Sequence, residues 1–414
     1  MPPRLTTFVF KIVSMLSVFM LAQSCLKSDN PGLPADVVDA IAQTGHNRVE
    51  LTKTIGHFID TDDSIYLKSA FFLIANIPQQ YAVDYTIKNE KNQEIDFNPE
   101  NFVSYDAIEN WWNTQQIKGY RLFYEAKKFS VDKDTISAEL LISTINQAVS
   151  SRSYPWAKAF TTADFFQYIL PYRFENEHIY DWRTAILSDF SWIAESAKTS
   201  TKAEDVIQLI NDYVNTNFVF DKRYLRVASV QTYPEIMLSR RGNQSDLAHL
   251  KASIARSFGI PATIDYTPYL ADSISGFFFA VAQDSRGKFN PMLPVNSIDL
   301  FKKNKIPKVY RRIFVLNEAS LFAQKNHRLK TPPYIGHYHY LDVSSDYLSV
   351  ENIDFRNNTS DTLYYIGVHN DKKWRAVDWT ISKDSLVSFR DMGKGINYQL
   401  LIMQNDSLVR VHTE

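Results

Sequence analysis

Ser245 and His249 combine a hydroxyl and an imidazole four residues apart within a predicted helix at 245–258. Positions with this spacing share one helix face, so the imidazole could lie near the hydroxyl. A serine activated by a histidine is a nucleophile for hydrolysis or acyl transfer. The competing interpretation, which we favour, is that Ser245 caps the helix and His249 lies on the surface.

His337 and His339 are two residues apart on a predicted strand, so their side chains point to one face. Two histidines and a carboxylate could bind zinc. The sequence offers no clear ligand beyond Asp342, and we interpret the histidines as a structural pair. We therefore predict neither a metal nor a cofactor.

Aromatic residues make up 14% of the chain, which raises the question of sugar binding, because rings stack on sugar faces. Most rings in so aromatic a chain belong to the core. The candidate platforms are Trp111 with Trp112, Tyr154 with Trp156, and the series Tyr334, Tyr338 and Tyr340.

Cys25 is the single cysteine, so the chain can form no internal disulfide and has no second thiol for catalysis. Arg4 and Lys11 precede an apolar run from Ile12 to Ala22, which is the layout of a secretory signal peptide and too short to span a membrane. The sequence Leu-Ala-Gln-Ser-Cys at 21–25 resembles a bacterial lipobox. We interpret 1–24 as a lipoprotein signal peptide and 25–34 as the lipidated Cys25 with its tether.

This leader predicts export and anchoring in the outer membrane at the cell surface through lipid chains on Cys25. The competing interpretation is an ordinary signal peptide followed by a free thiol. The formal net charge is -1 and no Lys/Arg-rich run occurs, so nothing indicates a nucleic-acid partner.

Periodicity divides the remaining chain into three parts. Helical patterns cover 35–58, 65–76, 105–126, 133–150, 161–195, 202–216 and 245–258, while 79–104 looks irregular. A strand at 262–267 precedes a hairpin whose first strand is 277–283 and whose turn is 284–287.

From residue 308 onward, short Val, Ile, Tyr and Phe runs alternate with polar turns, which is typical of a β-sandwich. These runs are 309–316, 337–343, 349–355, 362–368, 376–381, 386–390 and 397–403. We predict an α+β protein with a helical region at 35–150, an α+β core at 151–307 and a β-sandwich at 308–414.

Several separate segments, in this order, resemble the transglutaminase-like lipoproteins of Bacteroidota. The resemblance implies a papain-like core for 151–307 and extends over nearly the whole chain after the leader. The segments are 45–51 (GHNRVEL), 67–78 (LKSAFFLIANIP), 164–173 (DFFQYILPYR) and 259–268 (GIPATIDYTP).

Active members of that family carry Gly-x-Cys-x-Asp at the start of the buried helix and Gly-His-x-Trp on the first hairpin strand, with an acid or amide on the next strand. Here the helix start reads Gly242-Asn243-Gln244-Ser245-Asp246, so Gln244 replaces the cysteine. Phe277 stands at the histidine, Phe279 at the tryptophan and Asn290 near the third position. Glutamine is no nucleophile and phenylalanine cannot carry a proton, so the resemblance implies a degenerate active site.

We therefore predict a catalytically inactive, transglutaminase-like surface lipoprotein that binds a glycan or a partner protein. Whether its old cleft is filled or open is left undecided by the sequence. Two alternatives stay open: an active hydrolase or acyltransferase using Ser245 and His249, and a structural subunit of an envelope complex. The residues expected around the cleft are Gly242, Gln244, Ser245, Asp246, Phe277 and Phe279.

Overall fold

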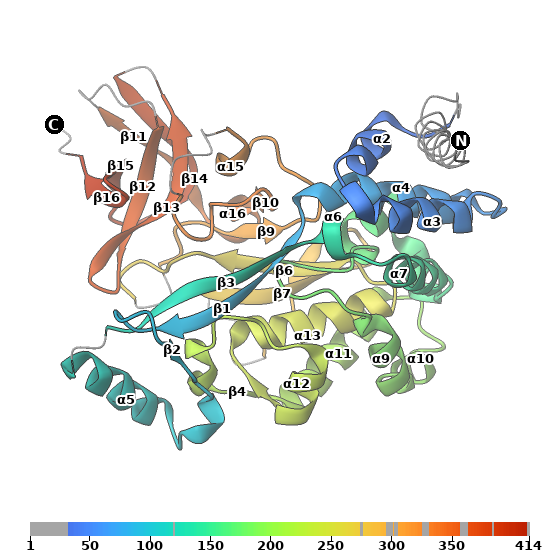
Figure 1. The fold of residues 1–414 in the computed structure, drawn as a ribbon, viewed down its shortest axis with the longest axis horizontal. Coiled ribbons are helices and arrows are strands. Elements are labelled where there is room, and N and C mark those ends of the chain that lie inside the picture. Colours follow the sequence, from blue (N-terminus) through green and yellow to red (C-terminus); the bar gives the residue numbers. More distant parts are fainter. Residues whose placement is uncertain are drawn as a thin grey trace, which may run out of the picture.

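The computed structural model describes residues 32–118, 121–273, 276–294, 301, 305–324, 331–356, 363–382 and 385–411. Helices and strands mix along the chain in an α+β fold, as the sequence predicts, with the N-terminal helices and the C-terminal strands at opposite ends of the molecule (Figure 1). Cys25 and the rest of the leader lie outside the described residues.

A cluster of helices opens the described chain. It consists of α2 (Ala35–Ala42), α3 (Arg48–Phe58), α4 (Ser64–Asn76), α6 (Asp132–Thr135) and α7 (Ala138–Ser151). The predicted helix at 35–58 is two helices, because Gly45 takes a positive φ of 53° between them. Leu51, Leu73 and Ile145 are fully buried in the apolar core that joins these helices.

A three-stranded sheet follows, two of whose strands lie in the segment 79–104 that the sequence predicts to be irregular. Strands β1 (Tyr81–Lys88), β2 (Glu94–Ile95) and β3 (Phe123–Val131) pair in the order β2-β1-β3. Helix α5 (Tyr105–Ile117) lies between β2 and β3 in the chain, so the predicted helix at 105–126 ends early. The sequence does not predict these strands, because β1 pairs along its full length only with β3, some forty residues later, and β3 is exposed along most of its length.

The central helices pack around α13 (Gln244–Ser257). The predicted helix at 161–195 is a series of short pieces: α8 (Thr162–Asp164), a π-helical turn (Phe165–Ile169), α9 (Trp182–Asp189) and α10 (Trp192–Ser196). After them come α11 (Ala203–Asn217), strand β4 (Val219–Phe220), α12 (Tyr233–Ser239) and strand β5 (Arg241–Gly242). Ile210, Ile254 and Phe258 belong to the core that joins these helices to the sheet.

The central sheet has the order β10-β9-β6-β7-β8. Strands β6 (Ala262–Thr267) and β7 (Phe277–Gln283) have the predicted bounds, and β8 (Phe289–Pro291) completes the predicted hairpin. Strands β9 (Tyr310–Arg312) and β10 (Tyr340–Asp342) lie in runs that the sequence predicts as part of the sandwich. The prediction is wrong for both, because β9 pairs with β6 and β10 pairs with β9. Hydropathy alone cannot tell which of two neighbouring sheets a short strand joins.

The C-terminal sandwich therefore begins at β11. One sheet has the order β13-β12-β15-β16 and the other pairs β11 with β14. Short helices α15 (Leu321–Gln324) and α16 (Ser344–Tyr347) lie in the segment before it. Its strands are β11 (Val350–Arg356), β12 (Leu363–Asn370), β13 (Lys373–Ile381), β14 (Leu386–Gly393), β15 (Gln399–Gln404) and β16 (Ser407–Arg410), of which the sequence missed only β16.

Candidate binding cleft

A cleft of about 1220 Å³ opens where α13 begins, between the central sheet and the β1–β3 ribbon. In Figure 1 the ribbon crosses in front of β6 and β7, and α13 lies below them. Five further segments contribute lining residues: 174–176, 220–230, 243–245, the β9 end at 312–314 and the loop at 331–339. The region around the start of α13 is thus an open cleft.

Asn243 and Asp246 fix the start of α13 through a reciprocal capping box. Asp246 also accepts hydrogen bonds from the backbone N–H groups of Gln231 and Asn243, both at 2.8 Å. Burial raises the pKa of Asp246 above its usual value, although these bonds oppose the shift. At Gly242, a Cβ would lie 2.7 Å from the Asp246 Cβ, so only glycine fits there. Gly242 and Asp246 therefore hold the start of α13 in place but do not line the cleft.

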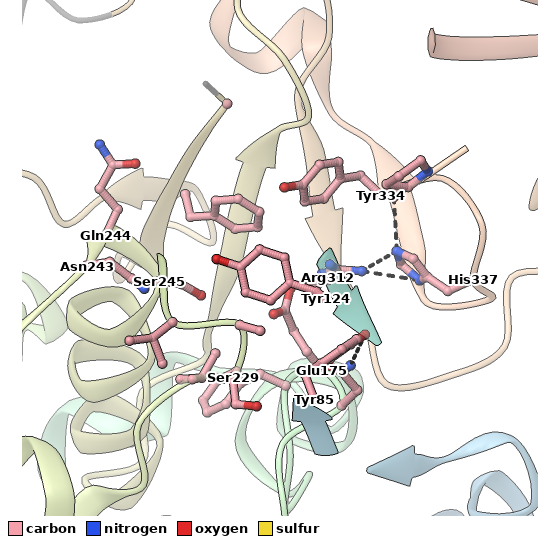
Figure 2. Close-up of a pocket in the computed structure, with 18 of the residues that line it drawn as sticks. Tyr85, Tyr124, Glu175, Ser229, Asn243, Gln244, Ser245, Arg312, Tyr334 and His337 are labelled. Atoms are coloured by element: carbon pink, nitrogen blue, oxygen red, sulfur yellow. Dashed lines mark hydrogen bonds and ion pairs between the residues drawn. The ribbon is translucent and has the colours of Figure 1, made fainter. Parts of the chain in front are cut away.

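Gln244 and Ser245 are the two residues of α13 that line the cleft. Figure 2 shows the Ser245 hydroxyl turned toward the pocket, while the Gln244 side chain extends away from Glu175 and Arg312. Ser245 is not the helix cap, because Asn243 takes that role. The sequence-based interpretation of Ser245 as the cap is therefore wrong.

His249 is buried, with 7% of its surface exposed, so its predicted surface location is also wrong. Its ring packs edge-on against Phe174, with 5.2 Å between ring centroids, and its Nε2 lies 3.7 Å from a Glu175 carboxylate oxygen. Burial lowers its pKa, but Glu175, Glu177 and Asp246 together raise it above the usual value. Within the described residues no hydrogen bond links the Ser245 hydroxyl to His249, so the proposed serine–histidine pair is not formed.

Strand β7 turns Phe278 toward the cleft, not Phe277 or Phe279. Alternate residues of a strand face opposite sides, and Phe277 and Phe279 stack on each other at 5.4 Å on the far face of the sheet. Phe278 stacks on Tyr266 at 5.5 Å with the planes 9° apart. The sequence therefore identified the correct strand and the wrong face.

Asn290 lies at the hairpin turn and outside the cleft lining. Its amide donates to an Asp284 carboxylate oxygen at 3.2 Å and to the Lys288 carbonyl at 2.9 Å. Asp284 also accepts from the backbone N–H of Lys288 at 2.9 Å, so Asn290 helps to hold the turn.

We call the buried group of Glu175, His249, Arg312 and His337 the floor of the cleft; three of them line the cleft, while His249 contacts Glu175 from outside the lining. Arg312 donates through Nε to Glu175, and its Nη1 contacts the His337 ring, as Figure 2 shows for the His337 contact. Its guanidinium also lies over the Tyr266 ring, 4.4 Å from the centroid. Burial alone would raise the pKa of Glu175, but Arg312 and His249 hold it at about 2. Burial and Arg312 lower the pKa of His337, so its imidazole is neutral.

We call strands β1, β2 and β3 with helix α5 the roof. The roof is fastened to the segment 222–227 by polar contacts. Glu109 pairs with Arg226 at 2.9 and 3.0 Å, and the Tyr124 hydroxyl donates to the Arg226 carbonyl at 2.7 Å. The Tyr224 hydroxyl donates to Glu100 at 2.7 Å. Tyr85 and Tyr124 remain 40% and 38% exposed at the cleft side of the roof.

His337, His339 and Asp342 do not converge on a metal position. His339 contacts the carbonyls of Val315 and Gln79, and Asp342 pairs with Lys308. In the described part of the chain, no group of three His, Cys, Asp or Glu side chains is arranged to hold a metal ion.

Of the aromatic candidates, only Tyr334 lines the cleft. Trp112 packs under the roof, Trp156 is fully buried with its N–H bonded to the Phe258 carbonyl at 2.7 Å, and Tyr340 is buried in the sheet. The sequence analysis does not identify five further tyrosines that line the cleft. They come from distant segments of the chain: Tyr81, Tyr85, Tyr105, Tyr124 and Tyr269.

Residues 174–284 match the family model of the transglutaminase-like superfamily. The matched region runs from Phe174 through α13 to the end of β7, so a transglutaminase-like domain supplies part of the cleft, while the lining residues at 79–124 and 312–339 lie outside the match. No curated protein matches the chain. Within the described ranges, no helix has the length and apolar character needed to cross a membrane.

Proposed function

We propose that this chain is a non-enzymatic surface lipoprotein that binds a ligand in the cleft of its transglutaminase-like domain. One observation carries the proposal: the cleft offers neither a thiol nor a free imidazole. Gln244 is the first residue of α13, and the only cysteine is Cys25 in the leader. Without a nucleophile and its base, hydrolysis or acyl transfer by the family's mechanism has no route.

The absence of a histidine from β7 does not depend on how this strand is aligned with the family. Residues 277–279 are all phenylalanine, so either face of the strand presents a ring that cannot accept a proton. Among the histidines that line the cleft, His337 is the one closest in position to the missing proton acceptor. Its Nδ1 accepts from the His339 backbone N–H at 3.1 Å, so Nε2 carries the proton of the neutral ring and donates to the Tyr334 carbonyl at 3.1 Å, with Arg312 in contact.

The open cleft supports binding over a purely structural role, because an unused active site would be expected to close by side-chain packing. Its aromatic and polar lining resembles that of ligand sites in general. The lipobox-like leader supports the surface location. Metabolic labelling with a fatty-acid analogue should tag the protein, and Cys25→Ser should abolish the label. Labelling that survives this substitution would refute the anchor.

The enzyme test uses the purified protein with amide and ester substrates and with a serine-directed fluorophosphonate probe. We expect no turnover above buffer and no label on Ser245. Ser245→Ala and Gln244→Ala are the matched variants. Turnover that either substitution abolishes would overturn the non-enzymatic proposal and would favour the alternative of a Ser245 hydrolase.

A further inference from the structure

The charged side chains of the cleft leave it without a net charge. Three acids and three bases line it: Glu109, Glu175, Asp371, Lys222, Arg226 and Arg312. Glu109 pairs with Arg226 and Glu175 with Arg312, while Asp371 lies 4.0 Å from Arg375. Lys222 is exposed. Because a bound charge needs an opposite charge that is free to meet it, and within the described chain Lys222 alone of these six is unpaired, this lining offers little to an ionic ligand.

Uncharged polar groups are, by contrast, left without protein partners. In the described residues, no hydrogen bond to another residue engages the side chains of Gln244, Ser245 and Ser229, which line the cleft. The same holds for the hydroxyls of three lining tyrosines, Tyr81, Tyr269 and Tyr334. These groups can both donate and accept, so they match a ligand that carries many neutral hydroxyls.

Rings dominate the apolar part of the lining. Ten phenylalanine and tyrosine side chains line the cleft, against five aliphatic ones. Tyr124 on the roof and Tyr334 in the loop both turn their rings into the same space, as Figure 2 shows. Flat rings favour flat ligand faces, whereas the apolar side chains of a peptide favour aliphatic pockets. The cleft of about 1220 Å³ also exceeds the roughly 1000 Å³ upper range of small-molecule pockets.

From these three observations we propose that the cleft binds an uncharged oligosaccharide, an inference that rests on the non-enzymatic binding function above. A pyranose has two apolar C–H faces and a rim of neutral hydroxyls. Its faces would stack on Tyr85, Tyr124 and Tyr334, and its rim would bond to Gln244 and Ser245. The size of the cleft fits more than one sugar ring.

The test is calorimetric titration of the purified protein with neutral gluco-, manno- and galacto-oligosaccharides, with uronic-acid oligosaccharides, and with neutral and charged peptides. We expect saturable binding of a neutral oligosaccharide whose affinity changes little between ~0.05 and ~0.5 M salt, because screening acts only on charges. Tyr85→Ala and Tyr334→Ala should each weaken it about 10-fold by removing a stacking surface.

Two controls separate stacking from misfolding. Tyr85→Phe keeps the ring and should stay within about 3-fold of wild type, since one exposed hydroxyl contributes little. Tyr338→Ala removes a partly buried tyrosine outside the lining, packed on Phe322, and should leave affinity unchanged.

The possible outcomes test the neutral-oligosaccharide inference separately from the proposed non-enzymatic binding function. Binding of acidic oligosaccharides or charged peptides with strong salt dependence would overturn the neutral-sugar inference and leave a non-enzymatic binding protein. Preference for a neutral peptide, or no binding by any member of the panel, would overturn the inference as well. Cleavage or modification of any ligand would instead overturn the non-enzymatic function.

Discussion

The floor and the roof of the cleft are built from different kinds of contact. On the floor, the side chains of Glu175, His249 and Arg312 are at most 11% exposed and come from three distant segments. In the roof, Glu109 and Arg226 are about 30% exposed, and Glu100 is 48% exposed. The roof also has a small apolar core of its own, around Trp112.

The difference indicates which side of the cleft can move. A buried ion pair is costly to break, because each charge is then left without a partner in a poorly solvated place. Exposed pairs contribute little, and segments held by them open locally at low free energy. We therefore expect a rigid floor that defines the ligand site and a roof that opens to admit the ligand.

Breaking the floor should have the largest effect. Arg312→Met leaves Glu175 buried without its main counter-charge, and we expect the free energy of unfolding to fall by about 3–5 kcal/mol. Chemical denaturation followed by circular dichroism measures it. Lys198→Met is the matched control, because Lys198 and Glu195 pair while 70% and 79% exposed, and should cost at most about 1 kcal/mol. Equal losses in the two variants would contradict the assignment of a rigid floor.

The contribution of the floor to the free energy of unfolding should also depend on pH. The pKa of Glu175 is about 2 in the folded protein, against an ordinary 4.5. A carboxyl with a lowered folded pKa stabilises the fold above its unfolded pKa, so this contribution is lost as pH falls from about 4.5 to about 2. It amounts to roughly 3 kcal/mol.

Unfolding free energy should therefore fall more steeply with acid in wild type than in Glu175→Gln over that window. Glu195→Gln, which alters a 79% exposed carboxylate, should follow the wild-type curve. Parallel curves for wild type and Glu175→Gln would show that Glu175 is not held ionised by the floor.

The same contrast explains what the sequence could predict. The bounds of β6 and β7 were correct because each is a continuous buried run between clear turn signals, and α13 was found through its apolar face. The roof strands were missed because their pairing joins segments far apart in the chain. The residue of β7 that faces the cleft was predicted one position away from Phe278. Three consecutive phenylalanines show no alternation of apolar and polar side chains, so the sequence does not tell which face of the strand is which. His249 was misplaced because its burial depends on Phe174 and Glu175, which no local pattern connects to α13.

Loosening the roof should affect motion more than stability. Glu109→Gln weakens the pair with Arg226 and should lower the free energy of unfolding by at most about 1 kcal/mol. Hydrogen exchange at the β3 amides should nevertheless become faster, because the roof opens more often. Glu94→Gln changes an exposed roof carboxylate that pairs with Lys127, away from segment 222–227, and should leave that exchange unchanged. If both variants exchange alike, the Glu109–Arg226 contact does not fasten the roof.

The smallest change isolates a single hydrogen bond of the roof. Tyr124→Phe removes the bond to the Arg226 carbonyl and keeps the ring, so we expect a loss of about 0.5–1 kcal/mol or less. Oligosaccharide affinity should hold within about 2-fold because the stacking face survives, while Tyr124→Ala should weaken it markedly. Faster ligand association in Tyr124→Phe, measured by stopped-flow fluorescence, would show that opening of the roof limits entry. Unchanged association with faster β3 exchange would mean that the ligand reaches the floor without moving the roof.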